Sequence, residues 1–166
     1  MTEEVRLRHP TETDHPRIAG VLDQWFGGRR VWPLVGRAWF RHFAGFSWLA
    51  EDEDGAPRGF LIGYRSPDRP EIAVVHLVAV DPGRRRRGIA RAMVDAFAGA
   101  AAASGASRLE AVAWPDEPLA IAFFRGLGFQ PEDGPGTQRL YGVPAFPDYE
   151  AKGEDRAVLV WSLPAR

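Results

Sequence analysis

Hydrophobic and polar positions change their period along the first third of the chain, and each change marks an element. Val5–Arg8 alternates apolar and basic residues, which predicts a short strand with one covered face. From Ile18 to Phe26 the apolar residues recur at helical spacing, so we expect a helix there. Thr13 or Asp14 is its cap, Pro16 lies in its first turn and Gly27–Gly28 ends it. A second helix is predicted from about Pro33 to Phe43, with an apolar stripe of Leu34, Ala38, Trp39 and His42.

The middle of the chain carries the pattern of a sheet. Trp48–Ala50 and Gly59–Tyr64 flank an acidic turn with a glycine, which predicts an antiparallel hairpin. Ile72–Val80 is almost wholly apolar and rich in valine, the composition of a strand buried on both faces. We therefore expect Ile72–Val80 to be the central strand.

A helix and a second buried strand follow this central strand. The helix is expected from Gly88 to about Ala103, and Arg108–Ala113 forms the next strand. Because a helix connects the two strands, they should be parallel neighbours. The face that the helix buries consists of Ile89, Met93, Val94 and Phe97.

The last third is less regular. Leu119–Leu127 predicts a short helix, and Phe129 begins an edge segment. Residues 131–155 are rich in proline, glycine and acids, so we expect a long irregular connection. Ala157–Leu163 alternates again and predicts a last strand. With 166 residues, the chain suits one hydrophobic core, and we expect a single α/β (α+β) domain over residues 1–166, with a mixed central sheet of about six to seven strands flanked by helices.

Composition narrows the classes of function. The chain has no cysteine, which excludes disulfides and cysteinyl intermediates, and its four histidines show no metal-ligand spacing, so no metal is expected. No apolar stretch approaches the ~20 residues of a membrane span, and the N-terminus lacks a signal peptide pattern, so we expect a cytoplasmic protein with no membrane partner. A net charge of −1 argues against a nucleic-acid partner.

The most informative segment links the central strand to the following helix. Val78–Val80 runs into an Asp-Pro-Gly turn, then into Arg84–Arg87, and Gly88-x-Ala90 opens the helix. A run of arginines alone indicates a solvated basic loop or a patch for nucleic acid. Between a strand and a helix start, however, small residues and converging backbone amides favour a phosphate-bearing ligand. The spacing is neither that of a dinucleotide-binding fold nor that of a P-loop.

Three motifs together resemble the Gcn5-related N-acetyltransferase (GNAT) superfamily. Arg85–Ala90 matches the Gln/Arg-x-x-Gly-x-Gly/Ala cofactor motif, Leu77–Pro82 matches its lead-in, and Ala120–Phe129 is similar to the helix that ends in Gly-Phe. The resemblance spans nearly the whole chain. The finer pattern, which includes Gly27–Arg29 and Asp148–Tyr149, resembles a bacterial subgroup for which the resemblance supplies no substrate.

The resemblance implies an acyl-CoA N-acyltransferase fold with acetyl-CoA as cosubstrate. It implies that the diphosphate binds the backbone amides of Arg86–Arg91, that the pantetheine arm follows Val78–Val80, and that the thioester lies between two splayed parallel strands. The acetyl group then passes by direct attack to a primary amine of a small molecule or peptide, and a homodimer is an option. The cofactor-binding set is Val78, Ala79, Val80, Arg85, Arg86, Arg87, Gly88, Ile89, Ala90, Arg91 and Phe124.

A base must remove the proton of the attacking ammonium group. His76 is the first candidate, because it precedes Val80 by four residues on the central strand and imidazole titrates near neutral pH. The alternative is a core histidine held by a backbone carbonyl. Glu71 is the rival base, and water is a third option. Strand parity puts Glu71 and His76 on opposite faces unless a bulge intervenes.

The general acid of the family is a tyrosine, and the matching residue here is Phe124, which has no proton to donate. Tyr141 and Tyr149 are the remaining candidates for this role, or the thiolate leaves unassisted. The missing tyrosine also leaves a second hypothesis, a catalytically weak acyl-CoA-binding sensor of the same fold.

The acceptor pocket is expected between the first two helices and the long connection. Tryptophans from those segments can wall it or belong to the core, and the acids of the connection can attract a cationic amine or simply be solvated. The tryptophans are Trp25, Trp32, Trp39 and Trp114, and the acids are Asp148, Glu150, Glu154 and Asp155.

Overall fold

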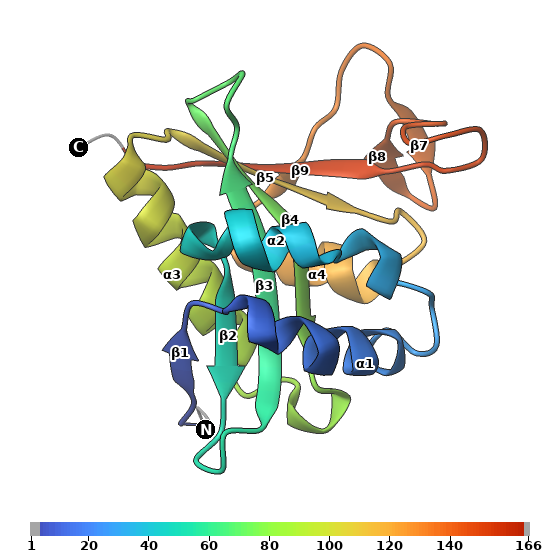
Figure 1. The fold of residues 1–166 in the computed structure, drawn as a ribbon. Helices are drawn as coiled ribbons and strands as arrows, with labels where there is room; N and C mark the ends of the chain where they lie inside the picture. Colours follow the sequence, from blue (N-terminus) through green and yellow to red (C-terminus); the bar gives the residue numbers. More distant parts are fainter. Residues whose placement is uncertain (1–3, 165–166) are drawn as a thin grey trace.

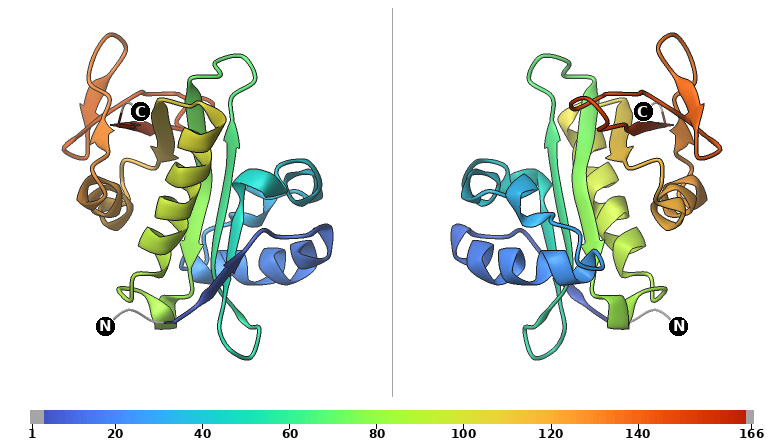
Figure 2. Two further views of the ribbon diagram at one scale, coloured as in Figure 1. Left: turned by 90° about the vertical axis from the view of Figure 1, so that its left-hand side faces the viewer. Right: turned by 90° about the vertical axis from the view of Figure 1, so that its right-hand side faces the viewer.

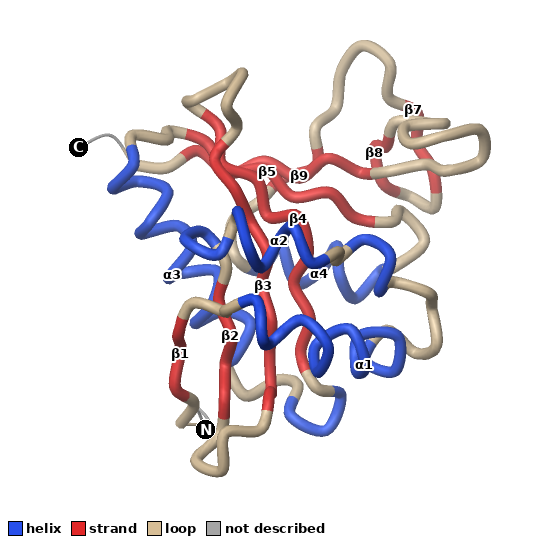
Figure 3. Tube along the Cα trace, in the orientation of Figure 1, coloured by secondary structure: helices blue, strands red, loops and turns tan. Residues whose placement is uncertain are grey.

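The structure, a computed structural model, describes residues 4–164 and forms one layered α/β arrangement (Figures 1 and 3). The strands are β1 Arg6–Arg8, β2 Trp48–Glu51, β3 Pro57–Arg65, β4 Ile72–Val80, β5 Arg108–Ala113, β6 Gln130–Pro131, β7 Gln138–Leu140, β8 Val143–Ala145 and β9 Ala157–Ser162. The α-helices are α1 His15–Trp25, α2 Arg37–His42, α3 Ile89–Ser104 and α4 Pro118–Gly126.

A mixed sheet separates two layers of helices. Its order is β1-β2-β3-β4-β5-β9-β6, and β7 and β8 form a separate two-stranded sheet. β4 and β5 pair in parallel, as the connecting helix predicted. Helices α1 and α2 cover one face, whereas α3 and α4 cover the other (Figure 2). The expected mixed sheet flanked by helices is therefore confirmed.

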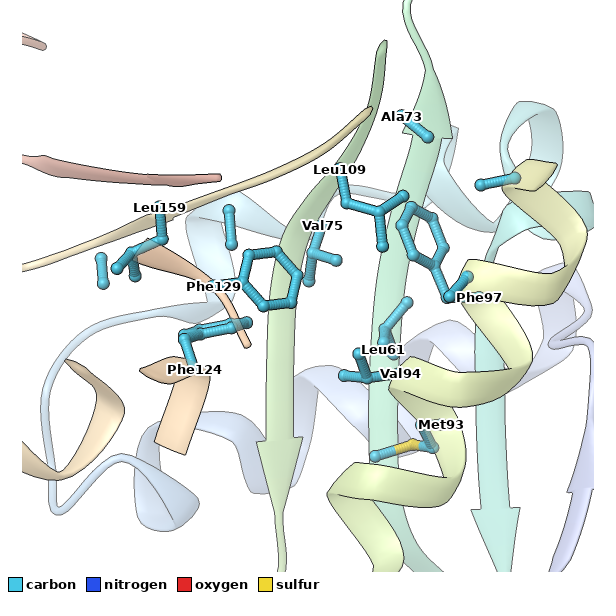
Figure 4. Packing of buried hydrophobic residues seen from close by; sticks show 14 of the residues in the cluster. Leu61, Ala73, Val75, Met93, Val94, Phe97, Leu109, Phe124, Phe129 and Leu159 are labelled. Carbon is cyan, nitrogen blue, oxygen red and sulfur yellow. The ribbon is translucent and has the colours of Figure 1, made fainter. Parts of the chain in front are cut away.

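Each face of the sheet has its own core. On the α3 face, Phe97 and Met93 pack with Leu61, Val75 and Leu109 (Figure 4). Helix α3 approaches β3 so closely that a Cβ atom at Gly63 would lie 2.3 Å from the ring of Phe97, so only glycine fits at this point. On the other face, α1 buries Ile18, Leu22 and Trp25 against Phe60, Ile62, Leu77 and Ala79.

A bulge in β4 shapes the sheet at its centre. Ile62 of β3 lies opposite Leu77, but the next residue, Gly63, lies opposite Val75, so His76 is the extra residue of the bulge. Strands β4 and β5 pair only as far as Val75 and Ala111. Beyond that point the pairing ends and the two strands diverge, with β4 continuing to Val80 (Figure 1).

Three expectations need correction. The helix predicted over Pro33–Phe43 is divided into a 3-10 turn, Trp32–Leu34, and the shorter α2, because the backbone leaves the helical conformation at Val35 and Gly36. Its buried residue is Phe40, whereas Leu34, expected in the stripe, is 41% exposed. The connection 131–155 is not wholly irregular, since it contains the β7–β8 hairpin. Finally, most of β4 alternates between buried and half-buried residues rather than being buried on both faces.

A buried ion-pair network joins β1, β2 and α1. The Arg8 guanidinium donates to both carboxylate oxygens of Asp14 at 2.9 Å and to Glu51 at 2.7 and 3.0 Å. Arg17 pairs with the same two acids. Asp14 and Glu51 are 4% and 3% exposed. Hydrogen bonds from Arg8 hold the pKa of Glu51 at about 2 and that of Asp14 well below its usual range.

Candidate active site

The loop between β4 and α3 presents backbone amides to one point. Gly88, with a φ of 82°, is the N-cap of α3, and no side chain in the described structure caps this helix end. The first turn of α3 also has no acidic residue among the described positions. The leading amides of a helix have no carbonyl partners within it and carry the positive end of its dipole. The geometry therefore fits an anionic group such as a diphosphate.

The arginines of this loop have separate surroundings. The Arg85 guanidinium donates to the Trp25 carbonyl at the end of α1, and its Nε donates to the Val80 carbonyl at 3.4 Å. Arg91 donates to the Gly126 carbonyl at the end of α4 at 3.3 Å. Arg85, Arg86 and Arg87 are all exposed. Arg85 and Arg91 therefore tie the loop to two helices, and the loop backbone carries the anion-binding geometry.

One edge of β4 is unpaired where the strand diverges from β5. Residues Val78–Val80 lie in the segment that pairs with β3 on one side. On the other side, no strand of the described chain pairs with β4 beyond Val75. The backbone groups of Val78, Ala79 and Val80 on that side therefore have no strand partner in the described chain and could hydrogen-bond a ligand that runs along the strand. A pantetheine arm that hydrogen-bonds along a strand would need such an unpaired edge.

A cleft of about 500 Å³ lies among the α1–α2 connection, the end of β5 and the β8–β9 connection. Its lining carries both signs of charge and two aromatic rings, those of Trp114 and Tyr141. The lining residues are Arg29, Arg30, Pro33, Leu34, Trp114, Pro115, Asp116, Tyr141, Gly153, Glu154, Asp155 and Arg156.

Trp114 is the centre of the charged lining. The Arg29 guanidinium lies 4.4 Å from its ring centroid, and that of Arg156 lies 5.1 Å from it. Arg29 also pairs with Glu117 at 3.1 Å and Asp116 at 3.6 Å. The α1–α2 connection, the β5–α4 turn and the start of β9 thus meet at one tryptophan.

Only part of the expected pocket gathers here. Trp114, Glu154 and Asp155 line the cleft, but Trp25 belongs to the α1 core. Arg29, Arg30 and Arg156 were not expected as lining residues. Gly27 and Gly28 mark the end of the first helix, so they indicated that Arg29 and Arg30 lie on the connection that follows. No local pattern indicated that Arg156 would lie on the same tryptophan as Arg29.

His76 lies on the α2 face, next to the cleft. Its Nε2 is 2.9 Å from the carbonyl oxygen of Leu34, a cleft residue. Because a carbonyl only accepts, Nε2 carries the hydrogen and Nδ1 keeps its lone pair. The imidazole stacks on Trp39 at 4.2 Å and 17°. Burial lowers the pKa of His76, while the Leu34 carbonyl and Glu150 act in the opposite direction.

The other candidates for proton transfer lie at separate places. Glu71 is exposed and precedes β4, at the end of the strand remote from Val80. Tyr141 lines the cleft and is 76% exposed. Burial, aided by Glu150, raises the pKa of Tyr149. Phe124 is buried, with its ring centroid 5.2 Å from that of Phe129.

Two kinds of feature are absent from residues 4–164. These residues contain no cluster of three or more histidine or acidic side chains arranged to hold a metal ion. Within the same residues, the helices are too short or too polar to cross a membrane.

Comparisons with known proteins agree with this geometry. The model of the acetyltransferase (GNAT) family matches residues 12–129. The L-2,4-diaminobutyric acid acetyltransferase of Streptomyces coelicolor is 36% identical over 146 residues, which cover 82% of this chain and 85% of the relative. The enzyme of that name from Nocardia farcinica is 35% identical over 113 residues, 68% of this chain but only 58% of the relative's length.

A solved structure shares the whole fold. It is the diaminobutyrate acetyltransferase of Paenibacillus lautus in complex with L-2,4-diaminobutyric acid and coenzyme A. The two chains are 22% identical, with a TM-score of 0.71 over 98% of each. The resemblance drawn from the sequence motifs is confirmed by the family match and by the relative from S. coelicolor. The chain belongs to the acetyltransferase (GNAT) family.

Proposed function

We propose that this protein is an acetyl-CoA-dependent N-acetyltransferase that acts on a primary amine of a small molecule. One observation carries the proposal. The uncapped start of α3 follows the unpaired edge of β4 in the chain, and the charged cleft lies at the end of β5, the strand whose pairing with β4 ends at Val75. An anion site, an extended backbone edge and a pocket for a polar molecule are the three parts that acetyl transfer from a coenzyme A thioester requires.

The residues of the first two parts fit acetyl-CoA, which supplies the acetyl group as a thioester. The amides from Arg86 to Arg91 would bind the diphosphate, and the backbone of Val78–Val80 would hydrogen-bond the pantetheine arm. Gly88 and Ala90 keep side chains away from the phosphates. The side chains of Ile89 and Phe124 are buried, so they would support this site from the hydrophobic core.

His76 is the base that we propose. Nδ1 accepts the proton of the acceptor's ammonium group, while the bond from Nε2 to the Leu34 carbonyl fixes the imidazole. The bulge turns His76 toward the α2 face, next to the cleft. Glu71 lies at the remote end of β4, so it is the weaker candidate. A backbone amide of β4 would donate to the oxyanion that develops during attack.

No tyrosine lies at the position of Phe124 to protonate the leaving thiolate. Tyr141 is the hydroxyl that lines the cleft, so we propose it as the acid, with protonation by water as the alternative. Tyr141→Phe then separates the two: a fall in kcat of roughly 10-fold or more supports the tyrosine. An unchanged kcat assigns the step to water.

L-2,4-Diaminobutyrate is the first acceptor to test, because two relatives above 30% identity carry its name in theirs. The cleft suits a molecule with both charges, since its lining carries three arginines and three acids. Release of free thiol from acetyl-CoA, measured with a panel of amines, tests the proposal. We expect His76→Gln to lower kcat by roughly 10²-fold. The acyl-CoA sensor of the same fold would bind acetyl-CoA and release no thiol with any amine.

A further inference from the structure

The charges that line the cleft are not all matched. Arg29 pairs with Asp116 and Glu117, and Arg156 pairs with Glu154 at 3.1 Å. Arg30 is exposed on the same lining, and no carboxylate of residues 4–164 lies within ion-pair distance of its guanidinium. The one ring that it meets is Trp32, whose centroid lies 5.5 Å from its guanidinium carbon. The cleft therefore offers one cation that the described chain does not neutralise.

The backbone around Arg30 is fixed. One carboxylate oxygen of Asp23 accepts from the amide of Val31 at 2.6 Å and from that of Trp32 at 3.0 Å. On the other side, Gly27 and Gly28 take φ values of 66° and 87°, and the Gly28 amide donates to the Asp23 carbonyl at 2.7 Å. One aspartate of α1 thus anchors both sides of the arginine pair. Arg30 is held toward the cleft by its backbone, although its side chain is exposed.

The geometry points to a carboxylate-bearing acceptor, an amino acid whose carboxylate binds Arg30 while its reacting amine faces His76. This inference rests on the proposed function and names the class of its substrate. Arginine presents a planar fork of donors that matches a carboxylate. Both groups border the α1–α2 connection, because Arg30 belongs to it and the Leu34 carbonyl of the same connection bonds to His76. A second ammonium group of the acceptor would meet Glu154 or Asp155 across the cleft.

Matched acceptors with and without the carboxylate test this inference. L-2,4-Diaminobutyrate and 1,3-diaminopropane differ by that group alone, as do ornithine and putrescine. We expect kcat/KM of the wild-type protein to favour the amino acid of each pair, and Arg30→Gln to lower that ratio roughly 10- to 100-fold through KM. Arg30→Lys should retain part of the preference. Arg41→Gln, an exposed arginine on α2 outside the cleft lining, is the matched control and should leave the ratio unchanged.

The possible failures are distinguishable. If the diamines are acetylated as well as the amino acids, or if Arg30→Gln changes the ratio less than threefold, the carboxylate site is wrong and acetyl transfer stands. If the diamines give no product at all, the rise in KM for diaminobutyrate in Arg30→Gln decides the question alone. If acetyl-CoA binds but no pair yields product, the proposed acceptor class fails, and this inference fails with it.

Discussion

The ion-pair cluster of β1, β2 and α1 and the ion-pair cluster at the cleft both combine arginines with acids, and they differ in burial. In the β1–β2–α1 cluster, Asp14 and Glu51 are almost fully buried, and both pair with Arg8 and Arg17. At the cleft, the side chains of Asp116 and Glu117 are 45% and 43% exposed. Both acids pair with Arg29, which lies on the α1–α2 connection. The first cluster fastens the N-terminal strand and helix to the sheet, whereas the second borders an open pocket.

Burial of the acids distinguishes a structural charge cluster from one that borders a binding pocket. A buried carboxylate must be matched, because an uncompensated buried charge costs several kcal/mol. An exposed ion pair contributes little to the free energy of unfolding, so an unmatched cation beside it costs little stability. The cleft contains such a cation, Arg30, and the buried cluster has both of its acids matched.

The largest expected effect is in the buried cluster. Glu51→Ala leaves the guanidinium groups of Arg8 and Arg17 with one acid fewer, so we expect the free energy of unfolding in urea to fall by about 3–5 kcal/mol. Asp116→Asn, the matched change in the cleft, should lower it by less than about 1 kcal/mol. Equal losses in the two variants would remove the distinction between the clusters.

Acid should unfold the protein through the same buried cluster. The pKa of Glu51 is about 2 in the folded protein, below its ordinary value near 4.3. The stabilisation is therefore present above pH ~4.3 and is lost as the pH falls from there toward 2, with Asp14 acting in the same direction. A loss on the order of 2–3 kcal/mol from Glu51 should appear in urea unfolding between pH 5 and pH 2.5. In Glu51→Gln that pH dependence should be clearly weaker, and an unchanged slope would contradict the assignment.

His76 lies between the two extremes, half-buried under Trp39. Burial lowers its pKa, so Trp39→Leu should let that pKa rise. Because the base acts when unprotonated, the acid limb of the pH–rate profile should move to higher pH, with a few-fold loss of kcat near pH 6.5. Trp39→Phe keeps an aromatic ring and should shift the limb less. A purely structural role would lower kcat equally at every pH.

The smallest effect on stability is expected at Arg29. Arg29→Gln removes its exposed pairs with Asp116 and Glu117 and should change the free energy of unfolding by about 0–1 kcal/mol. The cleft loses a cation, so KM for diaminobutyrate should rise several-fold. A large loss of stability with an unchanged KM would mean that this cluster is structural too.

Local patterns were enough to predict the strand, turn and helix that surround the proposed cofactor site. The valine-rich β4, the turn at Gly83 and the small residues at the start of α3 are contiguous, so their geometry was predictable. Gly36, where the predicted second helix is interrupted, was also a sequence signal, but the apolar spacing around it outweighed that signal.

The acceptor half depends on contacts between distant residues. The bulge at His76 results from the register of β4 with β3, and no single residue of β4 predicts it. Strand β9 inserts between β5 and β6, which brings Arg156 to Trp114. That insertion depends on pairing between strands far apart in the sequence, so the partners of Arg29 and Arg156 could not be predicted.

The proposed function depends on binding of the acetyl-CoA diphosphate by the backbone amides at the start of α3. Isothermal titration calorimetry of the purified protein with acetyl-CoA and with acetyl-pantetheine, which lacks the diphosphate and nucleotide, tests it most directly. We predict micromolar binding of acetyl-CoA and an affinity for acetyl-pantetheine weaker by roughly 10²-fold or more. Equal affinities, or no heat with acetyl-CoA, would contradict the assignment.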